Sequence, residues 1–395
     1  MLLPVQKLKE KILKDRYNSI IFKKSREKDL YLVGGYVRDI LIDVFSQDRD
    51  YVLTGDARAF AYEIRNITGG SIVDFKKGGV TRIVLKNGVT LDFSRCTGKI
   101  EEDLSKRDFT INAIAWTPGE GIIDPYKGLE DLKKRKIRSL SEENFVNDPL
   151  RMLRAYRFAA ELNGSIEKKT RKMIKRLHNM IKKVSSERIT LELFNILNSE
   201  RPEKYLKMAY LDGLLSDILS FNDKTLGHNI KEISGITDKF KKIPLKIKVE
   251  LNKTFSQNLT YKGLLRLELL MMGSHIRYEE ILLLKISKDI IRRVTLAQKG
   301  IKKFNKAKLF DIFYETKEGA IDVLILKNRI DLIKEIMKFR KIIKKGILSS
   351  KEITEVAGIS PGPDLGKAII NLKRAQFERK IKGKNEAKKL IKNIL

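Results

Sequence analysis

A change of hydrophobic period near residue 148 limits the possible folds more than any other feature of the chain. Before it, the runs DLYLVGG, RDYVLTG and GVTRIVLKNGVTLDFSR predict strands, and an Asn-Gly pair in the last run predicts a hairpin. DARAFAYEIRNITGG predicts a helix that ends at its glycines, and residues 1 to about 28 predict one short basic helix. After Asp148 the pattern is almost wholly helical. The sequence therefore predicts an α+β domain with a small mixed β-sheet and helices, followed by all-α domains.

The length of the chain and its apolar segments restrict the domain number and the compartment. With 395 residues the chain is longer than one hydrophobic core usually holds, so we expect two to four domains. The sequence has no apolar run long enough to span a membrane, and MLLPVQKLKEKILKD lacks the apolar core and cleavage site of a secretion signal. We therefore expect a cytoplasmic protein without a membrane partner.

The charge balance indicates a polyanionic partner. The chain has 82 Lys and Arg against 50 Asp and Glu, a formal net charge of +32. Such an excess repels itself, and the simplest reason for it is binding to nucleic acid through phosphate contacts. The alternative is a lysine-rich but merely solvated surface, because many of the lysines stand between helix-forming residues.

Two aspartates in DRDYVL suggest a metal site. Side chains two residues apart on a strand point to the same face, so Asp48 and Asp50 would project together as oxygen ligands for Mg²⁺. Asp92, in the strand that leaves the Asn-Gly hairpin, could supply a third carboxylate. Such a site suits phosphoryl transfer assisted by two metal ions. The alternative is a pair of surface aspartates in a turn.

The segment VGGYVRD lies upstream of the two acids and favours the metal-site interpretation. Gly34 and Gly35 would let backbone N–H groups approach a phosphate, and Arg38 would supply positive charge. The helix predicted to follow would add the positive end of its dipole.

Four blocks in order carry a family resemblance: LVGGYVRDIL with DRDYVL, KRDFTINAIAW, NDPLRMLRAYRFAAEL and SSERITLEL. Together they resemble the class II (bacterial-type) tRNA nucleotidyltransferases and poly(A) polymerases of the DNA polymerase β superfamily, over about residues 30–200. The resemblance implies a catalytic nucleotidyltransferase head followed by an all-α neck, body and tail. The expected boundaries are head 1–140, neck for base recognition 141–200, body 201–325 and tRNA-binding tail 326–395.

The resemblance also implies roles for individual residues in the head. Asp48 and Asp50 match the metal-binding catalytic pair, and Asp92 is the candidate third catalytic acid. Gly34, Gly35 and Arg38 match the phosphate-binding turn. The residues expected near the ribose and triphosphate are Arg107, Asp108 and Asn112.

In the neck, Asp148 and Arg151 match a pair that selects the base without a nucleic-acid template. The carboxylate would accept a hydrogen bond from the exocyclic amine of cytosine or adenine, and the guanidinium would donate to ring acceptors. Arg154 and, less firmly, Arg157 are expected near the nucleotide. Asp148 before a proline could instead be a helix cap. We interpret Glu187 and Arg188 as a structural ion pair.

One departure from the family pattern bears on the product. CCA-adding and A-adding members carry a long flexible loop between the third-acid strand and the RDFT block, whereas only Cys96 to Ile100 are left for it here. The resemblance therefore implies a CC-adding enzyme that works with a separate A-adding enzyme. Its partners would be Mg²⁺, CTP and the acceptor arm and 3′ end of tRNA, with ATP if addition continues and no obligate protein partner. The alternatives are a complete CCA-adding enzyme, a poly(A) polymerase and a non-catalytic RNA-binding protein.

Overall fold

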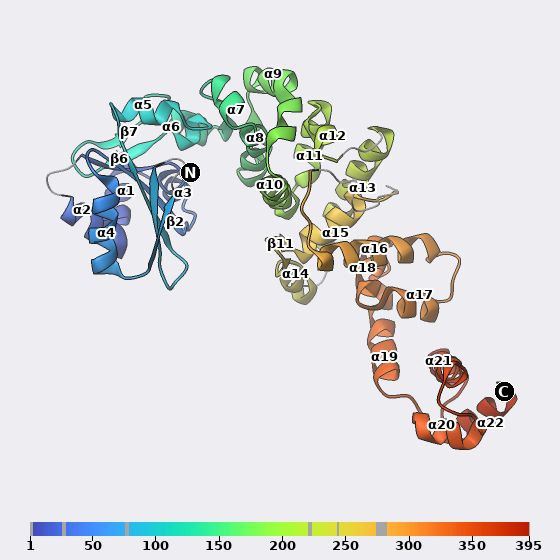
Figure 1. The fold of residues 1–395 in the computed structure, drawn as a ribbon. Coiled ribbons are helices and arrows are strands. Elements are labelled where there is room, and N and C mark those ends of the chain that lie inside the picture. The colour runs from blue at the N-terminus through green and yellow to red at the C-terminus, as the bar shows by residue number, and fades with distance from the viewer. Residues whose placement is uncertain are drawn as a thin grey trace. The chain divides into compact units, whose positions relative to one another are not determined.

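The chain forms two compact units in the computed structural model, which describes residues 3–25, 29–75, 79–219, 223–242, 245–273 and 283–394. Unit 1 comprises Met1–Asp223 with Ile281–Lys285, and unit 2 comprises Lys224–Glu280 with Ile286–Leu395 (Figure 1). Within the described ranges, none of the helices has the length and apolar character needed to cross a membrane.

A seven-stranded mixed sheet forms the N-terminal part of unit 1, with the order β3-β4-β5-β2-β1-β6-β7. Its strands are β1 (Leu30–Val33), β2 (Asp48–Leu53), β3 (Ser71–Phe75), β4 (Val80–Val84), β5 (Thr90–Arg95), β6 (Ala115–Thr117) and β7 (Gly121–Ile123). The predicted small mixed sheet is confirmed, including the hairpin of β4 and β5 around the Asn-Gly turn. The edge strand β3 was not predicted, because no face of it is buried and its side chains follow no alternating pattern.

The pairing of β2 brings the acidic residues of two strands together. β2 and β5 are parallel, and their register places Asp50 opposite Asp92 and Asp48 opposite Thr90. On the other side of β2, Val33 of β1 is the partner of Asp50. The chain turns at Gly34 immediately after β1, so the glycine turn lies beside the acidic positions.

Helices cover the sheet and complete its core (Figure 1). They are α1 (Val5–Lys14), α2 (Arg16–Lys24), α3 (Gly35–Leu41), α4 (Ala57–Thr68), α5 (Ile100–Ser105) and α6 (Gly128–Lys133). In the core, Phe93 stacks on Tyr51 with ring centroids 5.1 Å apart and meets the edge of Phe60 at 5.8 Å. The prediction of a single helix over residues 1–28 was wrong. Asp15 has extended backbone between α1 and α2, and its side chain caps α2.

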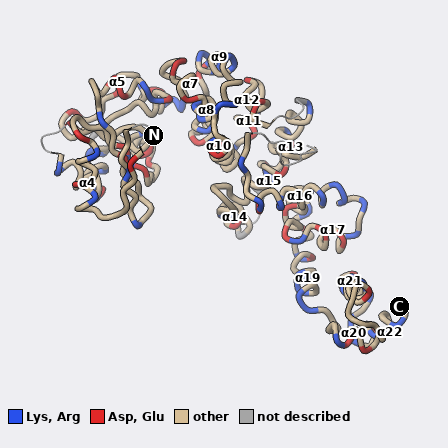
Figure 2. Tube along the Cα trace, in the orientation of Figure 1, with Lys and Arg blue, Asp and Glu red and all other residues tan. Residues whose placement is uncertain are grey.

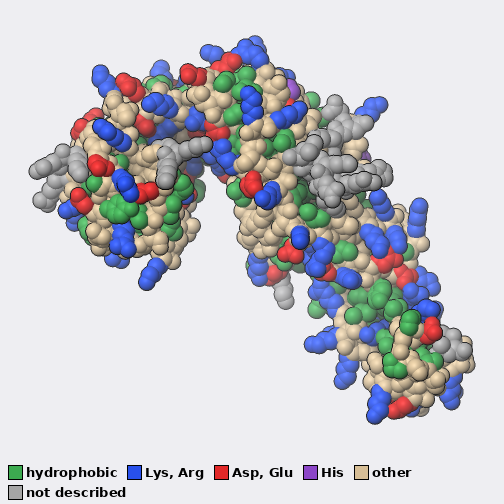
Figure 3. All heavy atoms as spheres, in the orientation of Figure 1, with side chains coloured by type: hydrophobic (Ala, Val, Ile, Leu, Met, Phe, Trp, Pro, Cys, Tyr) green, Lys and Arg blue, Asp and Glu red, His purple; other side chains and the backbone are tan. Residues whose placement is uncertain are grey.

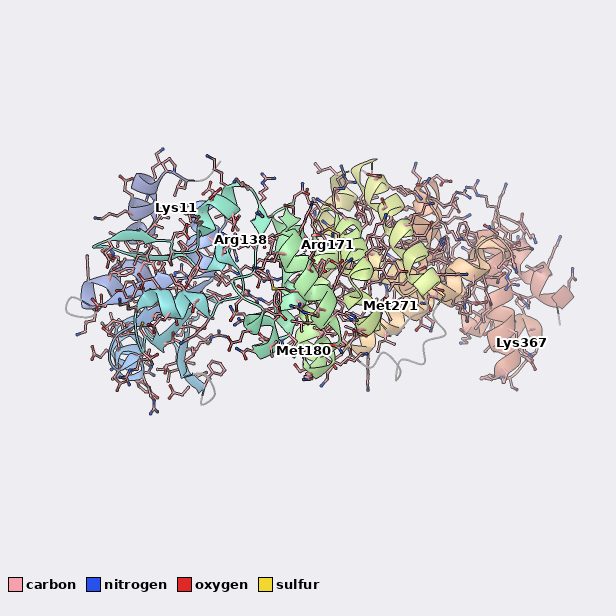
Figure 4. The ribbon with its side chains drawn as sticks, turned by 90° about the horizontal axis from the view of Figure 1, so that it is seen from above. Lys11, Arg138, Arg171, Met180, Met271 and Lys367 are labelled. Carbon is pink, nitrogen blue, oxygen red and sulfur yellow. The ribbon has the colours of Figure 1, made fainter. Side chains whose placement is uncertain are left out.

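Where the structure describes it, the rest of unit 1 is helical apart from two short strands, β8 (Lys136–Ile137) and β9 (Ser165–Ile166). Arg171 and Met180, labelled in Figure 4, lie in the segment that follows helix α8 (Leu150–Glu161). Helix α8 packs against α10 and α11. The buried carboxylate of Asp212 accepts hydrogen bonds from Tyr156 on α8 and Arg171 on α9. These helices are α7 (Glu143–Asn147), α8 (Leu150–Glu161), α9 (Lys168–Leu177), α10 (Ser186–Asn198), α11 (Pro202–Leu211) and α12 (Leu214–Leu219).

Unit 2 is almost wholly helical, as the pattern after Asp148 predicts. Its apolar side chains form one cluster around Phe310, Phe313 and Phe339 and a second around Leu365 and Ile391. Lys and Arg occur along many of its helices (Figure 2). Its elements are α13 (Asp223–Lys242), α14 (Leu245–Leu251), β10 (Thr254–Ser256), β11 (Leu259–Thr260), α15 (Tyr261–Leu270), α16 (Lys288–Lys303), α17 (Leu309–Thr316), α18 (Ala320–Leu326), α19 (Ile333–Lys344), α20 (Ser350–Ala357), α21 (Pro363–Phe377) and α22 (Lys384–Ile394).

Candidate active site

A pocket of about 490 Å³ in unit 1 collects most of the residues predicted from the sequence. Gly34 and Asp92 do not line it, although each lies beside a residue that does. The pocket is polar, and α3, β2 and α8 supply much of its wall. Its lining consists of Gly35, Tyr36, Arg38, Asp39, Ser46, Asp48, Asp50, Arg82, Arg107, Asp108, Asn112, Asp148, Arg151, Arg154, Arg157 and Phe158.

The Asp50 carboxylate of β2 lies in an environment that disfavours its negative charge. Burial raises the pKa of Asp50, and the charges of Asp92 and Asp48 raise it further, against the opposing effect of Arg107. The carboxylate of Asp48 is exposed and accepts a hydrogen bond of 2.5 Å from the Thr90 hydroxyl. A cation bound at Asp48 and Asp50 would relieve this repulsion.

Asp92 is engaged in another interaction. Arg82 on the neighbouring strand donates to both of its carboxylate oxygens, at 2.7 and 2.6 Å. Among the described residues, no group of three or more His, Cys, Asp or Glu side chains is arranged to hold a metal ion. Asp48 and Asp50 nevertheless fit a hard divalent cation, because both are oxygen donors that face one pocket. Asp92 remains a predicted third ligand, which would have to loosen its pair with Arg82.

Gly34 has a backbone conformation and a close contact that both require glycine. Its φ is 75°, and a Cβ there would collide with Nη1 of Arg107 and lie 3.4 Å from Oδ2 of Asp50. Its N–H donates to the Ile114 carbonyl at 3.0 Å, which ties the turn to the sheet. The absence of a side chain at Gly34 thus lets the Arg107 guanidinium lie against the turn, next to Asp50.

A buried chain of hydrogen bonds crosses the pocket from α3 to α8. Nη1 of Arg38 donates to Oδ1 of Asn112 at 2.5 Å, and Nδ2 of Asn112 donates to Oδ1 of Asp108 at 2.8 Å. Arg154 donates to Oδ2 of Asp108 from Nε and Nη2, at 2.9 and 2.7 Å. Burial raises the pKa of Asp108, but the charge of Arg154 and these hydrogen bonds outweigh it and lower the pKa overall. Predicted nucleotide-binding residues from three segments therefore form one connected network.

The Asp148 side chain does not cap α8, although Asp148 is the C-cap residue of α7. Helix α8 begins at Leu150, with Pro149 as its N-cap and no side-chain cap hydrogen bond. The Asp148 carboxylate accepts a hydrogen bond of 2.9 Å from Nη2 of Arg188, and its Oδ2 lies 4.0 Å from Nε of Arg151. Arg151 also donates to the Lys106 carbonyl at 2.8 Å. Asp148 and Arg151 thus lie side by side at the pocket, as their spacing predicts.

The predicted ion pair between Glu187 and Arg188 was wrong. Arg188 pairs with Asp148, whereas Glu187 pairs with Lys285 at 2.8 Å. Consecutive residues of a helix point in different directions, so these two side chains do not face each other. Sequence reasoning therefore missed Arg188 as a neighbour of the pocket.

Glu192 was also missed. Its carboxylate accepts a hydrogen bond of 2.5 Å from Nε of Arg157 and lies 3.6 Å from Nη1 of Arg154. Arg157 also pairs with Glu161 at 2.8 Å, and its guanidinium lies 3.8 Å from the ring centroid of Phe158. The four-residue spacing of Arg188 and Glu192 was the available signal, because it places both side chains on one face of α10.

Comparison with known proteins shows which enzymes the chain is similar to. Residues 82–138 match the poly A polymerase head domain, and residues 165–224 match the probable RNA- and SrmB-binding site of polymerase A. A CC-adding tRNA nucleotidyltransferase of Synechocystis sp. is 37% identical over 190 residues, which cover 47% of this chain and 45% of that protein. A CCA-adding enzyme of Leuconostoc mesenteroides is 28% identical over 374 residues, covering 88% of each chain.

The fold is that of a solved nucleotidyltransferase. A Thermotoga maritima CCA-adding enzyme, in complex with tRNA, superposes with a TM-score of 0.77 at 21% identity, covering 99% of this chain and 98% of that one. This structural match extends over both units, whereas the family models match parts of unit 1 and its boundary with unit 2. Together these matches support a class II nucleotidyltransferase of the CCA-adding type, and the chain is a nucleotidyltransferase.

Proposed function

We propose that the protein transfers cytidylyl groups from CTP to the 3′ end of tRNA and stops after the second addition. The observation that carries the stopping point is the short connection between β5 and α5. The N–H of Cys96 donates to the Leu53 carbonyl at 2.8 Å, and α5 begins at Ile100. Ile100 and Leu104 are buried in an apolar cluster with Val33. A connection held at both ends cannot act as a long mobile loop that reshapes the site for ATP.

The pocket residues would divide the work of nucleotidyl transfer. Asp48 and Asp50 would hold divalent metal, which we take to be Mg²⁺, and the bound metal would activate the tRNA 3′ hydroxyl and stabilise the leaving pyrophosphate. Gly34 and Gly35 would let the turn approach the triphosphate, and Arg38, in the last turn of the short helix α3, would supply positive charge. Charge from Arg107 would reach the same region, because its guanidinium lies against Gly34.

Asp148 and Arg151 would select the base. The carboxylate is an acceptor for the exocyclic amine of cytosine, and the guanidinium is a donor for its ring acceptors. Arg188 would hold the Asp148 carboxylate in place through the 2.9 Å hydrogen bond. Asp108 and Asn112 would present the ribose with groups already fixed by Arg154 and Arg38. Adenine carries a similar amine, so this pair alone would not stop the reaction at CC.

The tRNA would be bound mainly through phosphate contacts, which the net charge of +32 supports. Lysine and arginine side chains project from the face of unit 2 drawn in Figure 3. We keep the division into head 1–140, neck 141–200, body 201–325 and tail 326–395 as part of this proposal, with the tail as the tRNA-binding segment. Relatives named for CC addition and for CCA addition both match the chain, so the product has to be measured.

The test is to supply the purified enzyme with a tRNA that lacks its 3′ CCA, together with CTP, ATP or both, and to size the products. We expect growth by two nucleotides with CTP, no further growth when ATP is added, and poor use of a tRNA that already ends in CC. An Asp48→Ala variant, purified in the same way, controls for contaminating enzymes. Efficient addition of A to a CC end would instead identify a complete CCA-adding enzyme, and long A tails on unrelated RNA a poly(A) polymerase.

A further inference from the structure

An arginine lies between the two aspartates of β2 and is almost completely buried. The side chain of Arg49 is 3% exposed. Because side chains alternate along a strand, it lies on the opposite face from Asp48 and Asp50. A buried cation needs partners of opposite charge or with hydrogen-bond acceptors. The partners of Arg49 have no role in the pocket chemistry proposed above.

The partners of Arg49 come from α2 and its N-cap Asp15, from α3 and from Gln47 just before β2. Nη2 donates to Oδ2 of Asp15 at 2.7 Å, and Nη1 donates to the Gln47 carbonyl at 3.2 Å. The guanidinium lies 4.8 Å from the ring centroid of Tyr36 on α3 and 5.7 Å from that of Tyr17 on α2. One side chain of β2 therefore contacts two helices that carry no predicted catalytic acid.

The two carboxylate oxygens of Asp15 accept hydrogen bonds from different groups. While Oδ2 holds Arg49, Oδ1 accepts hydrogen bonds from the backbone N–H groups of Tyr17 and Asn18, at 3.1 and 3.0 Å, and so caps α2. Asn18 extends the network, because it donates to the Tyr36 hydroxyl at 3.1 Å and accepts from the Tyr51 hydroxyl at 2.5 Å. The start of α2, the first turn of α3 and strand β2 are thus joined by one buried polar network.

We propose that Arg49 is a positioning residue: its pair with Asp15 fixes the orientation of β2 so that Asp48 and Asp50 both face the pocket. Holding the middle residue on one face of a strand prevents rotation of the strand about its axis, and its two neighbours are then directed to the other face. The orientation of β2 needs support at this end of the strand, because Asp48 is the first residue of β2 and its side chain is exposed. The N-terminal helices become part of the catalytic unit. This inference rests on the proposed nucleotidyl transfer at Asp48 and Asp50.

The test removes the pair from either side. Arg49→Met keeps an unbranched apolar side chain but no charge, and Asp15→Asn keeps a residue that caps helices well but cannot pair with Arg49 as an anion. Small misplacements of reacting groups reduce rates strongly, so we expect kcat for CTP addition to fall about 10- to 100-fold in Arg49→Met and less in Asp15→Asn. The KM values for CTP and tRNA should stay near those of the wild type. Mn²⁺ binding, followed by the EPR signal of free Mn²⁺, should weaken in both variants.

A matched control is available in unit 2. Arg293 pairs with the buried Asp322 at 2.6 Å, and its guanidinium lies 5.4 Å from the ring centroid of Phe255. Arg293→Met therefore removes a similar buried pair far along the chain from β2. We expect it to lower the melting temperature while kcat and Mn²⁺ binding stay unchanged.

Wild-type kcat and Mn²⁺ affinity in Arg49→Met would overturn the inference, as would an equal loss of both in Arg293→Met. If Arg49→Met does not fold, Asp15→Asn and Arg49→Lys decide the question in the same two assays. If wild-type protein adds no cytidine at all, the proposed function fails, whereas the Mn²⁺ titration still reports whether Arg49 orients the two carboxylates.

Discussion

Replacing Gly34 by alanine tests whether the turn after β1 serves the pocket or only the fold. The φ of Gly34 is 75° and its ψ is −134°, a region that a residue with a Cβ rarely adopts. Holding alanine there destabilises the protein by about 1–3 kcal/mol. The new Cβ would also collide with Nη1 of Arg107, so the guanidinium would have to leave its place beside Asp50.

Gly69 provides the control, because it has nearly the same backbone strain without the clash. Its φ is 75° and its ψ is −163°, and a Cβ there would meet no atom within 4 Å. Gly69→Ala should therefore lose a similar amount of stability, about 1–3 kcal/mol, by urea unfolding followed by circular dichroism. The comparison separates the backbone effect from the displacement of Arg107.

Activity should distinguish the two variants. A charge-assisted contact to phosphate contributes about 1.5–3 kcal/mol, so loss of the Arg107 position should reduce kcat/KM for CTP by roughly 10- to 150-fold in Gly34→Ala. Gly69→Ala should keep wild-type kcat/KM at a temperature where both variants are folded. Arg107→Ala gives the reference value for complete loss of the side chain. Wild-type kcat/KM in Gly34→Ala would refute the role of the turn and of Arg107 in binding the triphosphate.

Three further predictions concern the carboxylates and the base-selecting pair. Asp48→Asn should abolish CTP incorporation without reducing tRNA affinity in a filter-binding assay, because the proposed tRNA contacts are to phosphates away from Asp48. Turnover like that of the wild type would exclude Asp48 as a catalytic ligand. Burial, with the charges of Asp92 and Asp48, raises the pKa of Asp50 in the folded protein, so the metal-free protein should lose stability as the pH rises through that raised pKa. In the proposed function Mg²⁺ would bind the ionised pair of Asp48 and Asp50, so it should raise the melting temperature more at pH 7 than at pH 4.5. An equal effect at both pH values would contradict this linkage. Arg188→Ala should free the Asp148 carboxylate and reduce the preference for CTP over UTP by about 1–3 kcal/mol in competition assays. Arg188→Lys should keep part of this preference. An unchanged preference in Arg188→Ala would mean that Arg188 has a structural role only.

Local sequence patterns were sufficient to predict most of the strands and helices of the head. Strands β4 and β5 could be predicted because alternation and an Asn-Gly turn act over neighbouring residues. The common orientation of Asp48 and Asp50 follows from the two-residue period of a strand. The edge strand β3 and the break at Asp15 were not predicted, since one depends on pairing with β4 and the other on a capping side chain within a basic helical pattern.

The sequence by itself determined the change from a mixed sheet to helices near residue 148, the position of the glycine turn, the two acids on one strand and the resemblance to nucleotidyltransferases. The roles of the individual site residues remain predictions. Only the tertiary structure decided the partners: Arg82 with Asp92, Arg188 with Asp148 and Asp15 with Arg49. The physical reason is the distance along the chain over which each kind of interaction acts. Backbone conformation and side-chain period depend on residues a few positions apart, whereas a buried charge pairs with whichever opposite charge the packing of distant elements brings within hydrogen-bonding distance.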